Sequence, residues 1–153
     1  MTRIEGEIVI NRLLEEVFDF VADERNEPRY TPRMLRAEKI SPGPIGVGTR
    51  FRAETKTMRG SAEMVIEVTA YERLRRLGSS TQLSLMEIHG TLAFEPFRER
   101  TRMHWEWDVE PRGLFKPFSS RVAWMGRRQE RRIWASLKRY LEAQPDALIV
   151  PQE

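Results

Sequence analysis

The stretch "IHGTLAFEPFRERTRMHWEWDVEP", residues Ile88–Pro111, contains two segments in which apolar and polar residues alternate. A period of two is typical of β-strands that bury one face. If the two strands are joined by a four-residue turn at 97–100, the pleat fixes which residues lie opposite each other. One face is then wholly apolar, with the pairs Phe94–Met103, Leu92–Trp105, Gly90–Trp107 and Ile88–Val109. The stretch therefore predicts an antiparallel hairpin with one buried face.

The other face of this hairpin carries His104, Glu106 and Asp108, a combination that suggests acid–base chemistry or a metal site. Same-face neighbours on a strand lie roughly 6.6 Å apart, at about 3.3 Å per residue, so a metal would need a further converging ligand. In this register the cross-strand neighbours of His104 and Glu106 are an alanine and a threonine, so the hairpin supplies no further metal ligand for them. His89 lies opposite Asp108, and a surface pair of this kind is typical of a weak ion pair. We therefore predict no metal site and no catalytic residues in this row.

The rest of the chain changes its hydrophobic period from two to about 3.6 and back, which predicts a mixture of strands and helices. The predicted elements are strands at 4–10, 34–41, 49–57, 61–69, 71–78, 81–96 and 101–110, a helix from a cap at Asn11 to about Asp23, a short helical turn or loop at 24–32, and a long helix that ends before Pro145. Strands that are linked by short turns and followed by a helix indicate an antiparallel sheet that curls around that helix, an α+β arrangement.

The composition is typical of one globular domain, with 153 residues, 40% hydrophobic and 32% charged. We place this domain at 1–144 and a C-terminal tail at 145–153. The sequence contains no cysteine, which excludes disulfides, thiolate metal sites and cysteine nucleophiles. It has neither a signal peptide nor an apolar run of membrane-spanning length, so we expect a cytoplasmic protein.

The positive charge is concentrated near the C-terminus. Residues 112–143 contain nine Lys or Arg residues and two Glu residues, although the whole chain has a net charge of only +3. Such a segment can attract nucleic acid or an anionic membrane, but a run of charge is usually a solvated helix face. We expect no nucleic-acid partner, leave open a peripheral membrane contact through this helix, and make no prediction of the oligomeric state.

The apolar faces of the strands raise a separate question about the interior. Large flat tryptophans and flexible methionines leave irregular space, and an apolar concavity is the usual form of a small-molecule site. The same residue types are equally typical of a filled core. The residues alone leave both interpretations open.

Several stretches, in their order and spacing, resemble a known protein superfamily. They are "EEVFDFVADERNEPRYTPRM" (Glu15–Met34), "GPIGVGTRF" (Gly43–Phe51), "FEPFRERTRMHWEW" (Phe94–Trp107) and "SLKRYLEA" (Ser136–Ala143). Together they resemble the START/Bet v 1-like (SRPBCC) superfamily, in particular its polyketide cyclase/dehydrase-like branch, over about 4–143. The resemblance implies a helix-grip fold, in which a seven-stranded curved antiparallel sheet wraps around a long C-terminal helix, with two short helices after the first strand.

The resemblance also implies an internal cavity that binds a small hydrophobic or amphipathic ligand, such as a lipid or an aromatic polyketide, and in some members transports it. The alternative is a cyclase or dehydratase that acts on a substrate in the same cavity, and the resemblance leaves enzymatic activity undecided. It implies no cofactor, no metal and no shared catalytic residues. Mapped onto this sequence, the ligand-binding residues are Phe51, Met64, Ile66, Met103, Trp105, Trp107, Phe118, Val122, Met125 and Gln129. Polar groups predicted to face inward are few, namely Thr55, Thr57, Gln129 and Arg76, which is little for acid–base catalysis.

Overall fold

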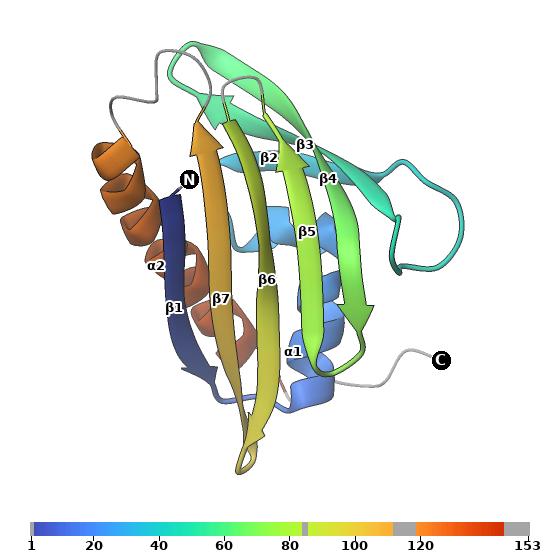
Figure 1. Ribbon diagram of the computed structural model, residues 1–153. Helices are drawn as coiled ribbons and strands as arrows, with labels where there is room; N and C mark the ends of the chain where they lie inside the picture. The colour runs from blue at the N-terminus through green and yellow to red at the C-terminus, as the bar shows by residue number, and fades with distance from the viewer. Residues whose placement is uncertain (1, 84–85, 112–118, 146–153) are drawn as a thin grey trace.

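The computed structural model describes residues 2–83, 86–111 and 119–145. Within these residues, seven antiparallel strands form one curved sheet, and the helices lie on one side of it (Figure 1). The strands are β1 (Thr2–Ile10), β2 (Met34–Lys39), β3 (Arg50–Thr57), β4 (Gly60–Glu72), β5 (Arg76–Gln82), β6 (Met86–Phe97) and β7 (Arg100–Pro111). The helices are α1 (Leu14–Ala22), the short 3-10 helix η1 (Glu24–Arg29) and α2 (Ser119–Glu142). This confirms the predicted α+β fold.

The order of strands in the sheet brings distant parts of the sequence together. Along the sheet the strands follow the order β1-β7-β6-β5-β4-β3-β2, and each neighbouring pair is antiparallel. From β2 to β7, every strand lies beside its sequence neighbour, as hairpins require. β1 is the exception, because it pairs with β7 at one edge of the sheet (Figure 1). Gly6 there lies opposite Trp105, whose indole ring occupies the space that a Cβ would need.

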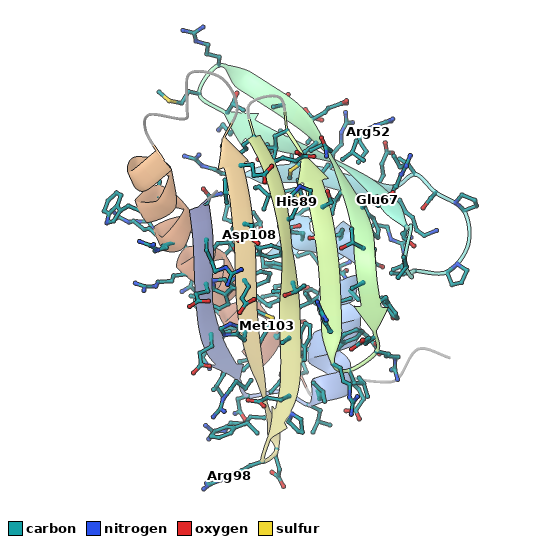
Figure 2. All side chains as sticks on the ribbon, viewed as in Figure 1. Arg52, Glu67, His89, Arg98, Met103 and Asp108 are labelled. Carbon is teal, nitrogen blue, oxygen red and sulfur yellow. The ribbon has the colours of Figure 1, made fainter. Side chains whose placement is uncertain are left out.

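The β6–β7 hairpin has the register that its alternating pattern predicts. Gly90 lies opposite Trp107, and a Cβ at position 90 would collide with the backbone of β7 and with the indole ring. The turn is tighter than the predicted four residues, because the ladder continues one pair further. Only Arg98 and Glu99 remain between the strands, and Arg98 at the tip has a φ of 60° (Figure 2).

Three local predictions are wrong, namely the helix cap at Asn11 and the bounds of the strands predicted at 71–78 and at 81–96. Helix α1 begins at Leu14 with Leu13 at its N-cap position, so Asn11 does not cap it. The predicted strands at 71–78 and 81–96 are divided differently, because the chain already turns after β4 and again between β5 and β6. Leu74 forms the first of these turns with a φ of 70°, a conformation that glycine or asparagine would normally mark in a sequence.

Two clusters of buried side chains hold the fold together. In the larger one, Phe18 of α1 packs edge-on against Phe94 of β6 with ring centroids 5.0 Å apart, and Leu137 of α2 is fully buried. The smaller cluster joins β2, β3 and β4 around Phe51. In α2, the first described residue that belongs to either cluster is Ile133. The preceding part of α2 therefore faces the sheet without contributing to either cluster.

Among the described residues, no helix is both long and apolar enough to cross a membrane. The predicted tail at 145–153 lies outside the described residues except for Pro145. The boundary between domain and tail therefore stays a prediction, as does the cytoplasmic location.

Candidate functional site

A cavity of about 470 Å³ lies beside the part of α2 that contributes to neither cluster. Its wall combines apolar side chains from β4, β6 and β7, among them Met64, Ile66, Leu92 and Val109. The end of α1, η1 and α2 supply the remaining sides. Small-molecule sites typically measure roughly 300–1,000 Å³ and are mostly apolar, so this cavity has the size and the lining of a ligand site.

The residues predicted to bind a ligand fall into three groups. Those that line the cavity are Met64, Ile66, Trp107, Met125 and Gln129. Those buried in the core outside the lining are Phe51, Met103 and Trp105. Phe118 and the side chain of Val122 lie outside the described residues. As ligand contacts, all ten stay predictions.

The face that α2 turns toward the sheet differs from the predicted one. The apolar spacing predicted that Met125 and Gln129 point inward, but Met125 is 62% exposed and both residues lie at the rim of the cavity. Gly126, Glu130 and Trp134 also line the cavity and are less exposed than Met125 and Gln129. The close approach of α2 to β1 explains this rotation, because a Cβ at Gly126 would collide with the side chain of Ile4.

One part of the cavity wall is acidic. η1 contributes Glu24 and Glu27, and α2 contributes Glu130, so three carboxyl groups line the same space as the apolar side chains. None of the three was predicted, because a charged residue on a helix is normally expected in solvent. Of the polar groups that were predicted to face inward, Thr55 and Gln129 line the cavity, whereas Thr57 and Arg76 are exposed.

Glu130 is held in place by two tryptophans. The indole Nε1 of Trp107 and that of Trp134 each donate a hydrogen bond of 2.9 Å to Oε2 of Glu130. The pKa of Glu130 is raised from 4.5 to about 7, because burial and then the charge of Glu27 raise it by more than the two indole hydrogen bonds lower it. At neutral pH this carboxyl is therefore close to half protonated, a state in which it can both donate and accept a proton.

Glu24 and Glu27 form a carboxyl pair. Burial raises the pKa of both groups, and their side chains share a hydrogen bond. Such a bond needs a proton on one partner. The pKa of Glu27 lies well above its ordinary value, so Glu27 is the group that holds this proton and Glu24 the one that accepts it.

Tyr30, directly after η1, lies next to this acidic group. Its side chain packs against the rings of Phe20 and Trp134, and the residue is 4% exposed. Burial and then the charges of Glu27, Glu24 and Glu130 raise its pKa well above the ordinary value, so the phenol stays protonated. The acidic part of the cavity therefore combines three carboxyl groups with one phenol.

His89 of the opening stretch lies on the face of the sheet that is turned away from the helices (Figure 2). His104 shares this outer face, because it alternates along β7 with the buried Met103 and Trp105. His89 lies across from Asp108 as predicted, but each has a different charged neighbour. Nε2 of His89 lies 3.7 Å from Oε1 of Glu87, and Nε of Arg3 lies 3.3 Å from Oδ1 of Asp108. This row is part of the outer surface and has no connection with the cavity lining.

β1 places a further carboxylate, that of Glu5, beside His104 and Glu106, which the sequence of the β6–β7 hairpin alone did not reveal. On the outer face, two groups bring possible metal-ligand atoms within 4.8 Å of one another: Glu5 with His104 and Glu106, and Glu87 with His89 and Glu110. Exposed carboxylates often gather in this way without a metal. The prediction that the protein holds no metal therefore stays a prediction.

A second, open depression of about 1330 Å³ runs along the outer side of α2. The basic side chains along it are Arg33, Arg127, Arg128, Arg131, Arg132 and Arg139. Beside them, Trp124 is 61% exposed, and the guanidinium of Arg128 lies 5.7 Å from its ring centroid. We call this surface the arginine groove. It has the opposite charge to the acidic part of the cavity.

The sequence matches one protein family over almost its whole length. Residues 1–142 match the family described as polyketide cyclase / dehydrase and lipid transport. No curated protein matches the chain.

Solved structures with the same fold cover nearly all of the chain. A protein from Thermus thermophilus has 18% identity and a TM-score of 0.77, with 94% of this chain and 99% of that one covered. A START superfamily protein from Mycobacterium smegmatis has 13% identity and a TM-score of 0.72 over 97% and 99%. The di-domain ARO/CYC BexL from the BE-7585A biosynthetic pathway has 21% identity and a TM-score of 0.74, over 93% of this chain and 47% of that one. At these identities the likeness establishes the fold.

Proposed function

Because this chain belongs to the polyketide cyclase / dehydrase and lipid transport family, we propose that it binds a small hydrophobic or amphipathic ligand in its cavity. The observation that carries the proposal is the cavity itself, which has ligand size and a wall of methionine, leucine, isoleucine, valine and tryptophan side chains. Burial of an apolar ligand there removes its surface from water, which contributes about 25 cal/mol for each Å². Transport of the ligand would use the same cavity.

A matched pair of substitutions on β5 tests this proposal. Ser79 lines the cavity, whereas Ser80 does not and is paired with His89 of the outer face. Ser79→Phe places a ring in the cavity, and Ser80→Phe places the same ring on the opposite face of the sheet. We expect Ser79→Phe to weaken the binding of a hydrophobic fluorescent dye by about tenfold or more, a loss of about 1.4 kcal/mol. Ser80→Phe should leave it unchanged, and equal behaviour of the two variants would contradict the proposal.

Native mass spectrometry of protein purified from its own host identifies a ligand directly. A bound molecule should add its mass to wild-type protein and should be absent from Ser79→Phe. A molecule retained equally by both variants would lie outside this cavity.

The second candidate is a cyclase or dehydratase, and Glu130 is the observation that favours it. A carboxyl with a pKa of about 7 inside an apolar cavity is suited to general acid–base catalysis at neutral pH. A simple probe is the dehydration of a synthetic aryl β-hydroxyketone to the enone and water, followed by absorbance. Catalysis should be lost in Glu130→Gln and retained in Glu63→Gln, which changes an exposed carboxylate on β4. If wild-type protein does not accelerate this reaction over buffer, the enzymatic candidate fails for this substrate class.

We also propose that the arginine groove contacts an anionic membrane surface. Six arginines line it, and within the described residues none of the five on α2 forms an ion pair. The exposed ring of Trp124 adds the amphipathic side chain that is typical of membrane interfaces. The groove shares Met125 and Gln129 with the rim of the cavity, so a membrane bound there would lie next to the ligand.

Vesicle sedimentation tests this contact. Vesicles with phosphatidylglycerol should bind the protein, those of phosphatidylcholine alone should not, and added salt should weaken the binding. Replacement of Arg131 and Arg132 by alanine should abolish it, whereas the same change at Arg50 and Arg52 of β3 should not. Binding that is insensitive to salt or to Arg131 and Arg132 would refute the proposal. The same assay with duplex DNA checks the expectation that the protein has no nucleic-acid partner.

A further inference from the structure

The acidic part of the cavity has no basic counterpart. Glu24, Glu27 and Glu130 line it, and among the described residues the lining contains no lysine, arginine or histidine. Buried carboxyl groups are normally paired with a cation or coordinate a metal. Here the fold provides hydrogen bonds from two indole groups and leaves the negative charge without a positive partner.

Tyr30 supplies an independent observation. It lines the same cavity and is more than nine-tenths buried, yet among the described residues no hydrogen bond involves its hydroxyl. The hydroxyl oxygen is not fully enclosed by the protein, so it opens onto the cavity, where a ligand can reach it. Its pKa responds to all three carboxyl groups, so the hydroxyl lies within their electrostatic reach. A group in the cavity next to the carboxyls would give it the missing partner.

These features select among ligands by the charge of their polar end. A carboxylate or phosphate would meet the ionised Glu24 and the partly ionised Glu130 in a medium of low dielectric constant, which is strongly unfavourable. A hydroxyl could form hydrogen bonds but would leave the carboxyl charge uncompensated. An ammonium group carries a positive charge and three donors, which match carboxylate and phenol oxygens as acceptors.

We propose that the ligand of this cavity is a cationic amphiphile, with an apolar body against the methionine and tryptophan wall and a protonated amine at Glu24, Glu27, Glu130 and Tyr30. This inference rests on the proposed function, because it names the class of ligand that the same cavity takes. The amine supplies the cation that the lining lacks and the hydrogen-bond partner that Tyr30 lacks. The apolar wall contributes affinity, and the acidic part contributes the choice between head groups.

Three probes with the same chain and different head groups test the inference: dodecylamine, dodecanol and dodecanoate, the two ionic probes below their critical micelle concentrations and the alcohol below its solubility limit. Isothermal titration calorimetry at pH 7 should show that the amine binds at least about tenfold more tightly than the alcohol, which corresponds to about 1.4 kcal/mol. The carboxylate should bind more weakly than the alcohol. Glu24→Gln and Glu130→Gln should each reduce the affinity for the amine by about tenfold and leave that for the alcohol within about twofold.

Glu63→Gln is the matched control, because it removes a carboxylate from the solvent-exposed side of β4 next to Met64 of the cavity wall. It should leave all three affinities unchanged. If either cavity variant fails to fold, as checked by circular dichroism, the other one carries the test.

The outcomes separate this inference from the proposed function. If dodecanol binds as tightly as the amine, or dodecanoate binds most tightly, the cavity binds amphiphiles and the preference for amines is refuted. An amine preference that persists in Glu24→Gln and Glu130→Gln would also overturn the inference, because the carboxyls would then not be its cause. If none of the three probes binds, both the inference and the proposed function fail for single-chain amphiphiles.

Discussion

Glu130 should make the stability of this protein depend on pH, and Glu130→Gln should remove that dependence. Glutamine has nearly the same shape and keeps an oxygen that can accept the hydrogen bonds from Trp107 and Trp134. It cannot ionise. The substitution therefore separates the cost of a buried charge from the packing of the side chain.

The size of the effect follows from the pKa of Glu130, which burial raises from 4.5 to about 7. Between these two values the folded protein holds a proton that the unfolded chain releases, so the protein loses stability as the pH rises. The contribution is fully present below pH 4.5 and is lost as the pH rises through about 7. At about 1.4 kcal/mol for each pH unit, this interval of about 2.5 units corresponds to at most about 3–4 kcal/mol.

Urea unfolding, followed by tryptophan fluorescence at pH 5.0 and at pH 8.5, measures this difference. At pH 8.5, Glu130→Gln should be more stable than the wild type by up to about 3–4 kcal/mol, and at pH 5.0 the gap should be no more than about 1 kcal/mol. Glu63→Gln should follow the wild type at both values. A gap that is the same at both pH values, or a variant that is less stable at pH 8.5, would mean that the ionised Glu130 is not penalised by its surroundings.

Four further substitutions test the packing and one ion pair, each by urea unfolding. Gly90→Ala should destabilise the protein by about 1–3 kcal/mol, because its Cβ would collide with the backbone of β7. Leu137→Ala should cost about 2–5 kcal/mol, whereas Met125→Ala, on the same helix but exposed, should cost less than about 1 kcal/mol; similar losses would refute the observed rotation of α2. Asp19→Asn removes an exposed ion pair with Arg73 and should lower the free energy of unfolding by no more than about 1 kcal/mol.

The hairpin of β6 and β7 could be predicted from the sequence down to its register. Apolar and polar residues alternate through both strands, and a slip of one residue would mix the two faces, so a single pairing satisfies the pattern. Gly90 opposite Trp107 added a steric requirement to the hydrophobic one. Strong periodicity and one tight contact were sufficient there.

The turn between β4 and β5 could not be predicted in the same way. Leu74 adopts a positive φ without glycine, asparagine or proline beside it, so no residue type signals a reversal. β5, with the sequence "RLGSSTQ", has few apolar residues and therefore little periodicity of its own. Its position is determined by the neighbouring strands β4 and β6.

The acidic part of the cavity was missed for a related reason. Apolar spacing on α2 favoured Met125, Gln129 and Ile133, and this rule assigns a glutamate such as Glu130 to solvent. The signal that could have corrected it was Gly126, which marks the side of the helix that approaches β1. Glu24 and Glu130 are far apart in sequence, and only the tertiary fold brings them to one cavity.

The pairing of β1 with β7 has a consequence for the time course of folding. Thr2 lies opposite Val109, so the first of the seven strands to be synthesised has its only sheet partner in the last one. The hairpins from β2 to β7 can form from local contacts, but the edge at β1 must wait for a long-range closure that costs loop entropy. Refolding should therefore show β1 acquiring protection from hydrogen exchange after β3 and β4. During synthesis, "IEGEIVI" remains an unpaired strand that is open to intermolecular pairing until β7 has left the ribosome.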